Sequence, residues 1–167
     1  MNKKNTNIHT LSFLVANKPG VLVRVAQVFA RRGFNIDSLV VSSSFDPKFS
    51  RMTITALGDL ATLDQIIKQC DKLIDVIHAS EHTGIDSVTR EVALVKIKAS
   101  KSTRPAIAKL LKKFHAKIVD DTNNALIIEQ TGTTDQLDEF ENLLKKYGLT
   151  EIVRSGKLVM AVGPKPT

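Results

Sequence analysis

The 167-residue sequence contains one cysteine, no tryptophan and one tyrosine, and it has no long uninterrupted run of hydrophobic residues. A single cysteine excludes an internal disulfide and a site built from several thiolates, and the apolar residues around Cys70 indicate a core position. Because charged residues interrupt every apolar segment, no segment is expected to span a bilayer. The polar start, Met1–Asn7, lacks the apolar region of a signal peptide, so a cytoplasmic protein is expected.

Positive charge is in excess, but it is not concentrated. The formal net charge is +7, with ten basic and six acidic residues in 1–80 and fourteen and eleven in 81–167. Neither half has a basic block of the kind that binds nucleic acid, although Arg24, Arg31 and Arg32 could face an acidic partner. A composition of 43% hydrophobic and 25% charged residues is that of an ordinary globular chain of one domain or two small ones.

Hydrophobic periodicity predicts the order βαββαβ over residues 8–80. Strands are expected at 10–16, 35–43, 51–57 and 74–79, with helices at 21–32 and after Asp59 as N-cap. The first helix is predicted to bury the face formed by Leu22, Val25, Ala26 and Phe29. The strands are predicted to point their apolar residues inward and to leave Thr10, Ser12, Thr53 and Thr55 outside.

After a polar connector at 81–89, which contains Gly84, the same order begins again over residues 90–163. The spacing of Thr133 and Gln136 predicts a capping box for a helix that stops at Gly148. Lys157–Val162 is expected to add one more strand to this second unit. The predicted fold class is therefore α+β, with two ferredoxin-like βαββαβ units.

The turn Asn17-Lys18-Pro19-Gly20, between the first strand and the first helix, is the candidate binding site. Gly20 lacks a Cβ, so the N–H groups of Gly20, Val21 and Leu22 could hold an anion at the positive end of the helix dipole. The side chain of Asn17 could meet an ammonium group, and together these groups suit a zwitterionic amino acid. Ordinary turn chemistry also explains Asn17 and Gly20, and local physics leaves both interpretations open.

The second unit has no such turn, because its first strand leads into Ser100-Lys101-Ser102-Thr103. The amino-acid site is therefore expected in the first unit only.

Motifs for catalysis are missing from the sequence. It contains no Gly-x-Ser-x-Gly, no Walker loop and no dinucleotide fingerprint, so enzymatic activity of the chain itself is not expected. The nearest group to a metal cluster is His78, Glu81 and His82. An i, i+4 histidine pair faces one ligand on a helix, whereas these residues lie at a predicted strand end, so no metal site is expected.

An RNA-binding module is the alternative from another class, because RNA recognition motifs share the βαββαβ order and this chain is basic. Such motifs stack bases on aromatic residues of the central strands. Arg51–Leu57 has none, and Thr10–Ala16 has only Phe13, which belongs to the apolar face.

Two stretches carry a resemblance to a known family. Asn17–Leu22, together with Arg31–Leu39, resembles the ligand-binding half of an ACT domain, a βαββαβ module that senses amino acids. Phe45–Ile54 is similar to a segment of the regulatory (small) subunit of acetolactate synthase, also called acetohydroxyacid synthase.

This resemblance implies a role in branched-chain amino-acid biosynthesis. The partner would be the catalytic (large) subunit, which would carry thiamine diphosphate, Mg and FAD, while this chain would hold no cofactor. The small subunit would activate that partner and confer feedback inhibition by valine. The effector would lie between the ACT domains of a homodimer, with Asn17, Gly20, Val21 and Leu22 from one chain and Asn35 from the other. The second unit would serve as an interaction domain.

Overall fold

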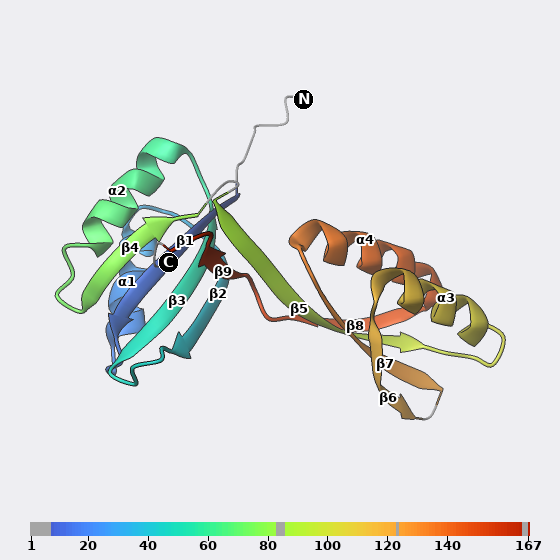
Figure 1. Cartoon of the computed structure of the whole chain (residues 1–167). Coiled ribbons are helices and arrows are strands. Elements are labelled where there is room, and N and C mark those ends of the chain that lie inside the picture. The colour runs from blue at the N-terminus through green and yellow to red at the C-terminus, as the bar shows by residue number, and fades with distance from the viewer. Residues whose placement is uncertain (1–7, 83–85, 123, 165–166) are drawn as a thin grey trace, which may run out of the picture. The chain divides into compact units, whose positions relative to one another are not determined.

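The computed structural model describes residues 8–82, 86–122, 124–164 and 167, and these divide into two compact units (Figure 1). The first unit contains the chain up to Thr89 together with Lys157–Thr167, and the second contains Arg90–Gly156. Each unit has its own hydrophobic core. Met1–Asn7 and Gly84, on which two of the sequence-based expectations rest, lie outside the described residues.

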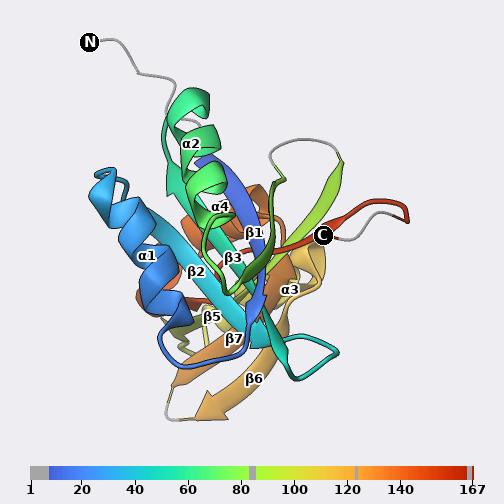
Figure 2. The ribbon, with the colours of Figure 1, turned by 90° about the vertical axis from the view of Figure 1, so that its left-hand side faces the viewer.

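The first unit has the predicted order βαββαβ. Its elements are β1 (Ile8–Ala16), α1 (Val21–Arg31), β2 (Ile36–Ser43), β3 (Phe49–Leu57), α2 (Leu60–Cys70) and β4 (Val76–Glu81). The four strands form an antiparallel sheet in the order β2-β3-β1-β4, so β2 and β4 are its edges. Both helices lie over the same face of this sheet (Figure 2).

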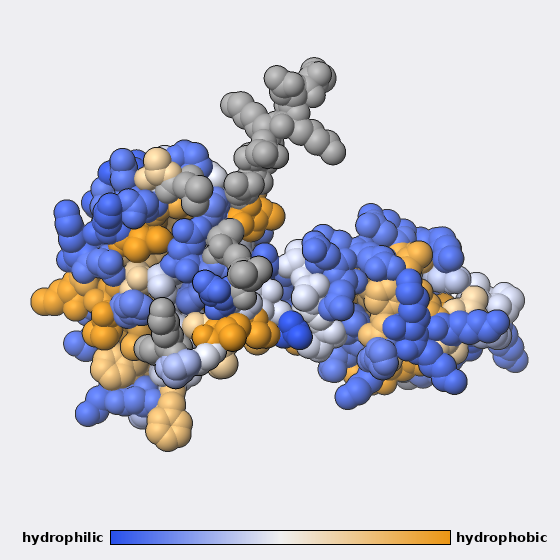
Figure 3. Space-filling model, turned by 45° about the horizontal axis from the view of Figure 1, so that its top comes forward, coloured by the Kyte–Doolittle hydropathy of each residue, from blue (hydrophilic) through white to orange (hydrophobic). Residues whose placement is uncertain are grey.

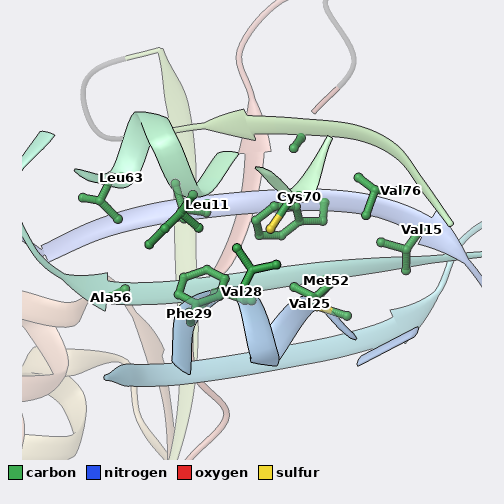
Figure 4. Packing of buried hydrophobic residues seen from close by; sticks show 14 of the residues in the cluster. Leu11, Val15, Val25, Val28, Phe29, Met52, Ala56, Leu63, Cys70 and Val76 are labelled. Carbon is green, nitrogen blue, oxygen red and sulfur yellow. The ribbon is translucent and has the colours of Figure 1, made fainter. Parts of the chain in front are cut away.

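The core of the first unit lies between this sheet and the two helices (Figure 4). Phe13 of β1 meets Phe29 of α1 edge to face, with ring centroids 6.4 Å apart. Cys70 is fully buried here as predicted, and burial raises the pKa of its thiol to about 12, so the thiol stays neutral.

The buried face of α1 differs from the predicted one. The helix buries Val21, Val25, Val28 and Phe29, whereas Leu22 is 40% exposed. Both sets fit the helical period, and the rotation of α1 about its own axis decides between them. That rotation is set by packing on the sheet, which the period alone does not specify.

The face of the sheet away from the helices is polar, as predicted, but it is not open to solvent. Thr10, Ser12, Thr53 and Thr55 are all buried. The C-terminal segment lies against this side, where the guanidinium of Arg51 donates to the carbonyl oxygen of Thr167.

The last strand, β9 (Leu158–Ala161), pairs with β5, so Lys157–Val162 does add a strand to the sheet that contains β5 to β8. The segment Lys157–Thr167 as a whole nevertheless groups with the first unit. Directly after β9, the N–H of Val162 donates to the carbonyl of Asp86 at 2.9 Å. The apolar pattern of residues 157–162 indicates a strand but does not specify the strand with which it pairs.

The second unit repeats the order of the first. It comprises β5 (Ser87–Lys98, assigned to this unit from Arg90 onward), α3 (Arg104–Phe114), β6 (Lys117–Thr122), β7 (Ala125–Gly132), α4 (Thr134–Leu144), the 3₁₀ turn η1 (Lys145–Tyr147) and β8 (Leu149–Arg154). The strand order is β6-β7-β5-β8. Its buried core is formed by Ala93, Val95, Ile97, Ala99, Ile107, Leu111, Leu126, Ile128, Leu137, Phe140 and Leu144.

Local signals set several helix boundaries where they were expected. Asp59 caps α2 by accepting from the N–H of Thr62 at 2.9 Å, and Thr133 and Gln136 form the capping box of α4. Gly33 follows α1 with a φ of +70° and Gly148 follows η1 with a φ of +75°, both in the left-handed region that favours glycine. Among the described helices, none is long and apolar enough to cross a membrane.

Candidate functional site

Three loops of the first unit meet at the turn Asn17–Gly20, which we call the α1 turn. The N–H of Asn17 donates to the carbonyl of Lys48 in the β2–β3 loop, and that of Ala16 donates to the carbonyl of Asp75 before β4, both at 2.8 Å. The side-chain amide of Asn17 also donates to the carbonyl of Pro47 at 3.0 Å. The α1 turn is therefore fixed to both neighbouring loops.

Gly20 gives this turn its conformation and leaves the start of α1 without a side-chain cap. Its φ is +83° and its ψ is −10°, a left-handed backbone that an L-residue adopts only with strain. A Cβ on Gly20 would find Arg24 Nη1 at 3.7 Å and no other neighbour within 4 Å among the described residues. The space in front of the glycine is thus open.

The N–H groups at the start of α1 differ in whether they have a hydrogen-bond acceptor. The helix begins with the bond from the N–H of Arg24 to the carbonyl of Gly20, at 3.1 Å, and the N–H of Val21 reaches Lys18 O over a long 3.4 Å. For Gly20 and Leu22, the described part of the chain provides no acceptor for the N–H. These donors, at the positive end of the helix, are suited to an anion.

Arg24 is a site residue that sequence reasoning missed, because it was placed on the polar face of the helix as a contact for a partner. Its guanidinium pairs with the carboxylate of Asp75, which lies before β4 and is 9% exposed. This ion pair holds the guanidinium beside Gly20, where it could form a charge-assisted hydrogen bond to a carboxylate. Its position in the sequence, one helical turn after Gly20, could have indicated that Arg24 lies beside the glycine.

The structure brings four of the five predicted site residues together. Asn17 and Gly20 are exposed in the α1 turn, Leu22 is part-exposed beside them, and the side chain of Val21 is buried beneath them. Asn35 is exposed but lies beyond the other end of α1, which is 11 residues and therefore about 17 Å long. Within one chain, Asn35 does not reach the α1 turn.

His82, directly after β4, and Glu81, at its end, make other contacts. His82 Nε2 lies 2.8 Å from Ser12 Oγ and 2.9 Å from Ser80 Oγ, whereas Glu81 Oε1 lies 2.6 Å from His9 Nδ1. Burial, and then the positive charge of Arg51, lowers the pKa of His82 below its usual range. Within the described ranges, no group of three or more metal-binding side chains converges.

Comparison with known proteins covers both units. Residues 11–78 match the family described as the AHAS small subunit-like ACT domain, and residues 90–163 match the one described as the small subunit of acetolactate synthase. The chain belongs to the acetolactate synthase small-subunit family. Its partner is by implication the catalytic subunit of that enzyme, and its first unit is an ACT domain.

Relatives of this family are similar over nearly the whole chain. The acetolactate synthase small subunit of Mycolicibacterium smegmatis is 45% identical over 96% of this chain and 94% of its own length. The probable small subunit of Archaeoglobus fulgidus is 46% identical over 94% of this chain and 98% of its own. The crystal structure of the small subunit from Thermotoga maritima superposes with a TM-score of 0.86 at 38% identity, covering 95% of this chain and 99% of that one.

The family assignment agrees with the position of the aromatic side chains. Phe13, the aromatic residue of β1, is fully buried in the core, so it is not available to stack on a base. The opposite face of the central strands carries Ser12, Thr53 and Thr55. Phe49, half-buried at the first position of β3, is on this outer face as well, but within the described β1 and β3 it has no second aromatic beside it, whereas RNA recognition motifs stack two or three bases.

Proposed function

We propose that this chain is the regulatory subunit that activates the catalytic subunit of acetolactate synthase and makes it sensitive to valine. The observation that carries the proposal is the uncapped start of α1, with free N–H donors and the guanidinium of Arg24 around open space at Gly20. A site of this kind attracts the carboxylate of an amino acid. It fits the sensing role of an ACT domain.

Each part of a bound valine has a counterpart in the α1 turn. The carboxylate meets the N–H groups of Gly20 and Leu22 and the guanidinium of Arg24. The ammonium meets the side-chain oxygen of Asn17, whose NH₂ is already used by Pro47. The isopropyl group lies on the exposed part of Leu22, while Val21 supports the turn from the core.

A second copy of the chain completes the site in this proposal. The edge strand β2 carries Leu39 and Val41, whose side chains point to the helix-covered side but are 37% and 43% exposed. An unpaired edge with exposed apolar residues suits pairing with an identical strand in a homodimer through the ACT domain. Asn35 of the second copy then supplies a further polar group to the effector.

Effector binding at the α1 turn can affect the catalytic subunit through the neighbouring loops to which the turn is hydrogen-bonded. Valine orders the α1 turn, and this turn is bonded to the β2–β3 loop at Lys48 and to the α2–β4 loop at Asp75. The effector regulates if the catalytic subunit binds one arrangement of these loops more tightly than another. The thiamine diphosphate, Mg and FAD belong to the catalytic subunit, in the cytoplasm, and this chain performs no chemistry itself.

Titration calorimetry of the full chain tests this function. Valine, leucine or isoleucine is expected to bind with a Kd in the micromolar to millimolar range, about −8 to −4 kcal/mol. Pocket shape decides the preferred effector, because one methylene changes the affinity by only about 1 to 3 kcal/mol. N-acetylvaline keeps the carboxylate and side chain but has no ammonium, so it should bind much more weakly. Equal binding of valine and N-acetylvaline would contradict the role given to Asn17.

A further inference from the structure

The second unit repeats the loop arrangement that surrounds the α1 turn. The N–H of Ala99 donates to the carbonyl of Asn124 in the β6–β7 turn at 2.7 Å, and that of Lys98 donates to the carbonyl of Gly148 before β8 at 3.1 Å. Asn17 and Ala16 make the same two kinds of bond in the first unit. The end of β5 is therefore the structural counterpart of the α1 turn.

A cavity of about 740 Å³ lies at this position, entirely within the second unit. Such a volume is within the range of small-molecule sites. Ala125, which is half-buried, gives the cavity an apolar side, the fully buried Ile97 and Ala99 lie beneath it, and Asn124 and Thr150 add polar groups at the rim. The Thr150 hydroxyl donates to the carbonyl of Lys96 at 3.0 Å, so its oxygen keeps acceptor capacity facing the cavity.

The charge of this cavity is positive and uncompensated. Lys98 and Lys101 line it, no acidic residue does, and neither ammonium has an ion-pair partner among the described residues. The stem of Lys98 lies along Gly148, where an added Cβ would be 3.4 Å from Lys98 Cβ. Two unpaired ammonium groups attract an anion and disfavour a ligand that carries an ammonium of its own.

We propose that this cavity binds a small organic anion, a carboxylate with a short branched apolar group and no ammonium. The lysines take the carboxylate, and Ala125 together with the alkyl stem of Lys98 takes the apolar group. The sequence-based expectation confined ligand binding to the first unit because the second lacks a glycine in its turn. The structure places a cavity in the second unit, and its attraction for an anion comes from the charges of Lys98 and Lys101 and not from bare backbone N–H groups.

Heteronuclear NMR of the uniformly ¹⁵N-labelled full chain tests the proposal, with three probes. The probes are 3-methylbutanoate, which has the proposed chemistry, valine, which adds an ammonium, and inorganic phosphate, which has no apolar group. The amides of Ala99, Ala125 and Thr150 should shift with 3-methylbutanoate at millimolar concentrations, and added salt should weaken the effect. Amides of the α1 turn, such as Leu22, report on the first unit separately, so failure of either site is recognised independently.

Variants show whether the lysines carry the binding. Lys98→Gln and Lys101→Gln should each weaken 3-methylbutanoate about fivefold, the effect of one partly screened charge. Lys109→Gln, an exposed lysine of α3 outside the cavity, should leave the affinity unchanged. The proposal is overturned if the cavity amides do not shift, if valine or phosphate binds there equally well, or if all three variants behave alike.

Discussion

At the scale of single residues, the α1 turn depends on one glycine and one arginine. Gly20 adopts a φ of +83°, and replacing it by an L-residue strains the backbone by about 1 to 2 kcal/mol. Arg24 brings a positive charge to the open side of that glycine, where Asp75 holds it. The effector's carboxylate is therefore proposed to bind at a position where any side chain would add backbone strain and where Arg24 supplies a positive charge.

The environment of His82 should make the stability of the chain depend on pH. The pKa of His82 is lowered by burial, and the unfolded chain, with a pKa of about 6.5, takes up a proton first as the pH falls. The stabilisation associated with neutral His82 is therefore complete above about pH 6.5 and is lost below it. Thermal unfolding should show a larger drop between about pH 7.5 and 5.5 in the wild type than in His82→Gln.

His78, an exposed residue of β4, provides the comparison for this pH dependence. His78→Gln should reduce the pH dependence less than His82→Gln does, because His78 contributes to the lowered pKa of His82 only after burial and the charge of Arg51. The account of His82 fails if its replacement leaves the pH dependence unchanged while the protein remains folded.

At the scale of the elements, α4 starts with a capping box that α3 lacks. Thr133 accepts from the N–H of Gln136, and the Gln136 side chain accepts from the N–H of Thr133. Thr103, the N-cap of α3, makes no side-chain cap bond. Thr133→Ala should lower the stability to urea by about 1 kcal/mol, and Thr103→Ala should cost clearly less. Equal losses, measured by circular dichroism, would mean that the capping box does not stabilise α4.

Element order and helix boundaries could be predicted because their signals are local. Asp59, Thr133 and Gly33 act on residues within one turn, so the sequence contains the whole interaction. Most of the core strand β1 could likewise be predicted, as Thr10–Ala16, since its inward residues alternate; the structure starts it two residues earlier, at Ile8. The same logic identified the α1 turn from Asn17, Pro19 and Gly20.

Other features depend on contacts between distant residues, and the sequence pattern did not contain them. The rotation of α1, which buries Val28 and exposes Leu22, is decided by packing on the sheet. The pairing of β9 with β5, and the grouping of Lys157–Thr167 with the first unit, depend on residues far from this segment in the chain. The cavity at the end of β5 arises from three separate loops, so the unremarkable sequence around Ser100 gave no sign of it.

At the scale of the whole molecule, the proposal requires two copies of the chain. The surface in Figure 3 is mostly hydrophilic, with apolar side chains reaching it in both units. Val41→Lys places a charge on the β2 edge and should shift the chain from dimer to monomer in light scattering, with weaker valine binding because Asn35 of the second copy is lost. Leu57→Lys, at a position of similar exposure in β3, should stay dimeric. A dimeric Val41→Lys that binds valine normally would show that the chains associate elsewhere.

Valine inhibition of Gly20→Asp, reconstituted with the catalytic subunit, is the most direct test of the central claim. The new carboxylate repels that of valine and fills its space, so a loss of about 3 kcal/mol would weaken binding more than a hundredfold. Gly163→Asp is the matched control, since Gly163 also has a positive φ and open space but lies in the C-terminal segment, away in sequence from both the α1 turn and Asn35. Acetolactate formation should be activated by both variants, with valine inhibition lost only in Gly20→Asp. Full valine inhibition of Gly20→Asp would place the effector site elsewhere and contradict the account.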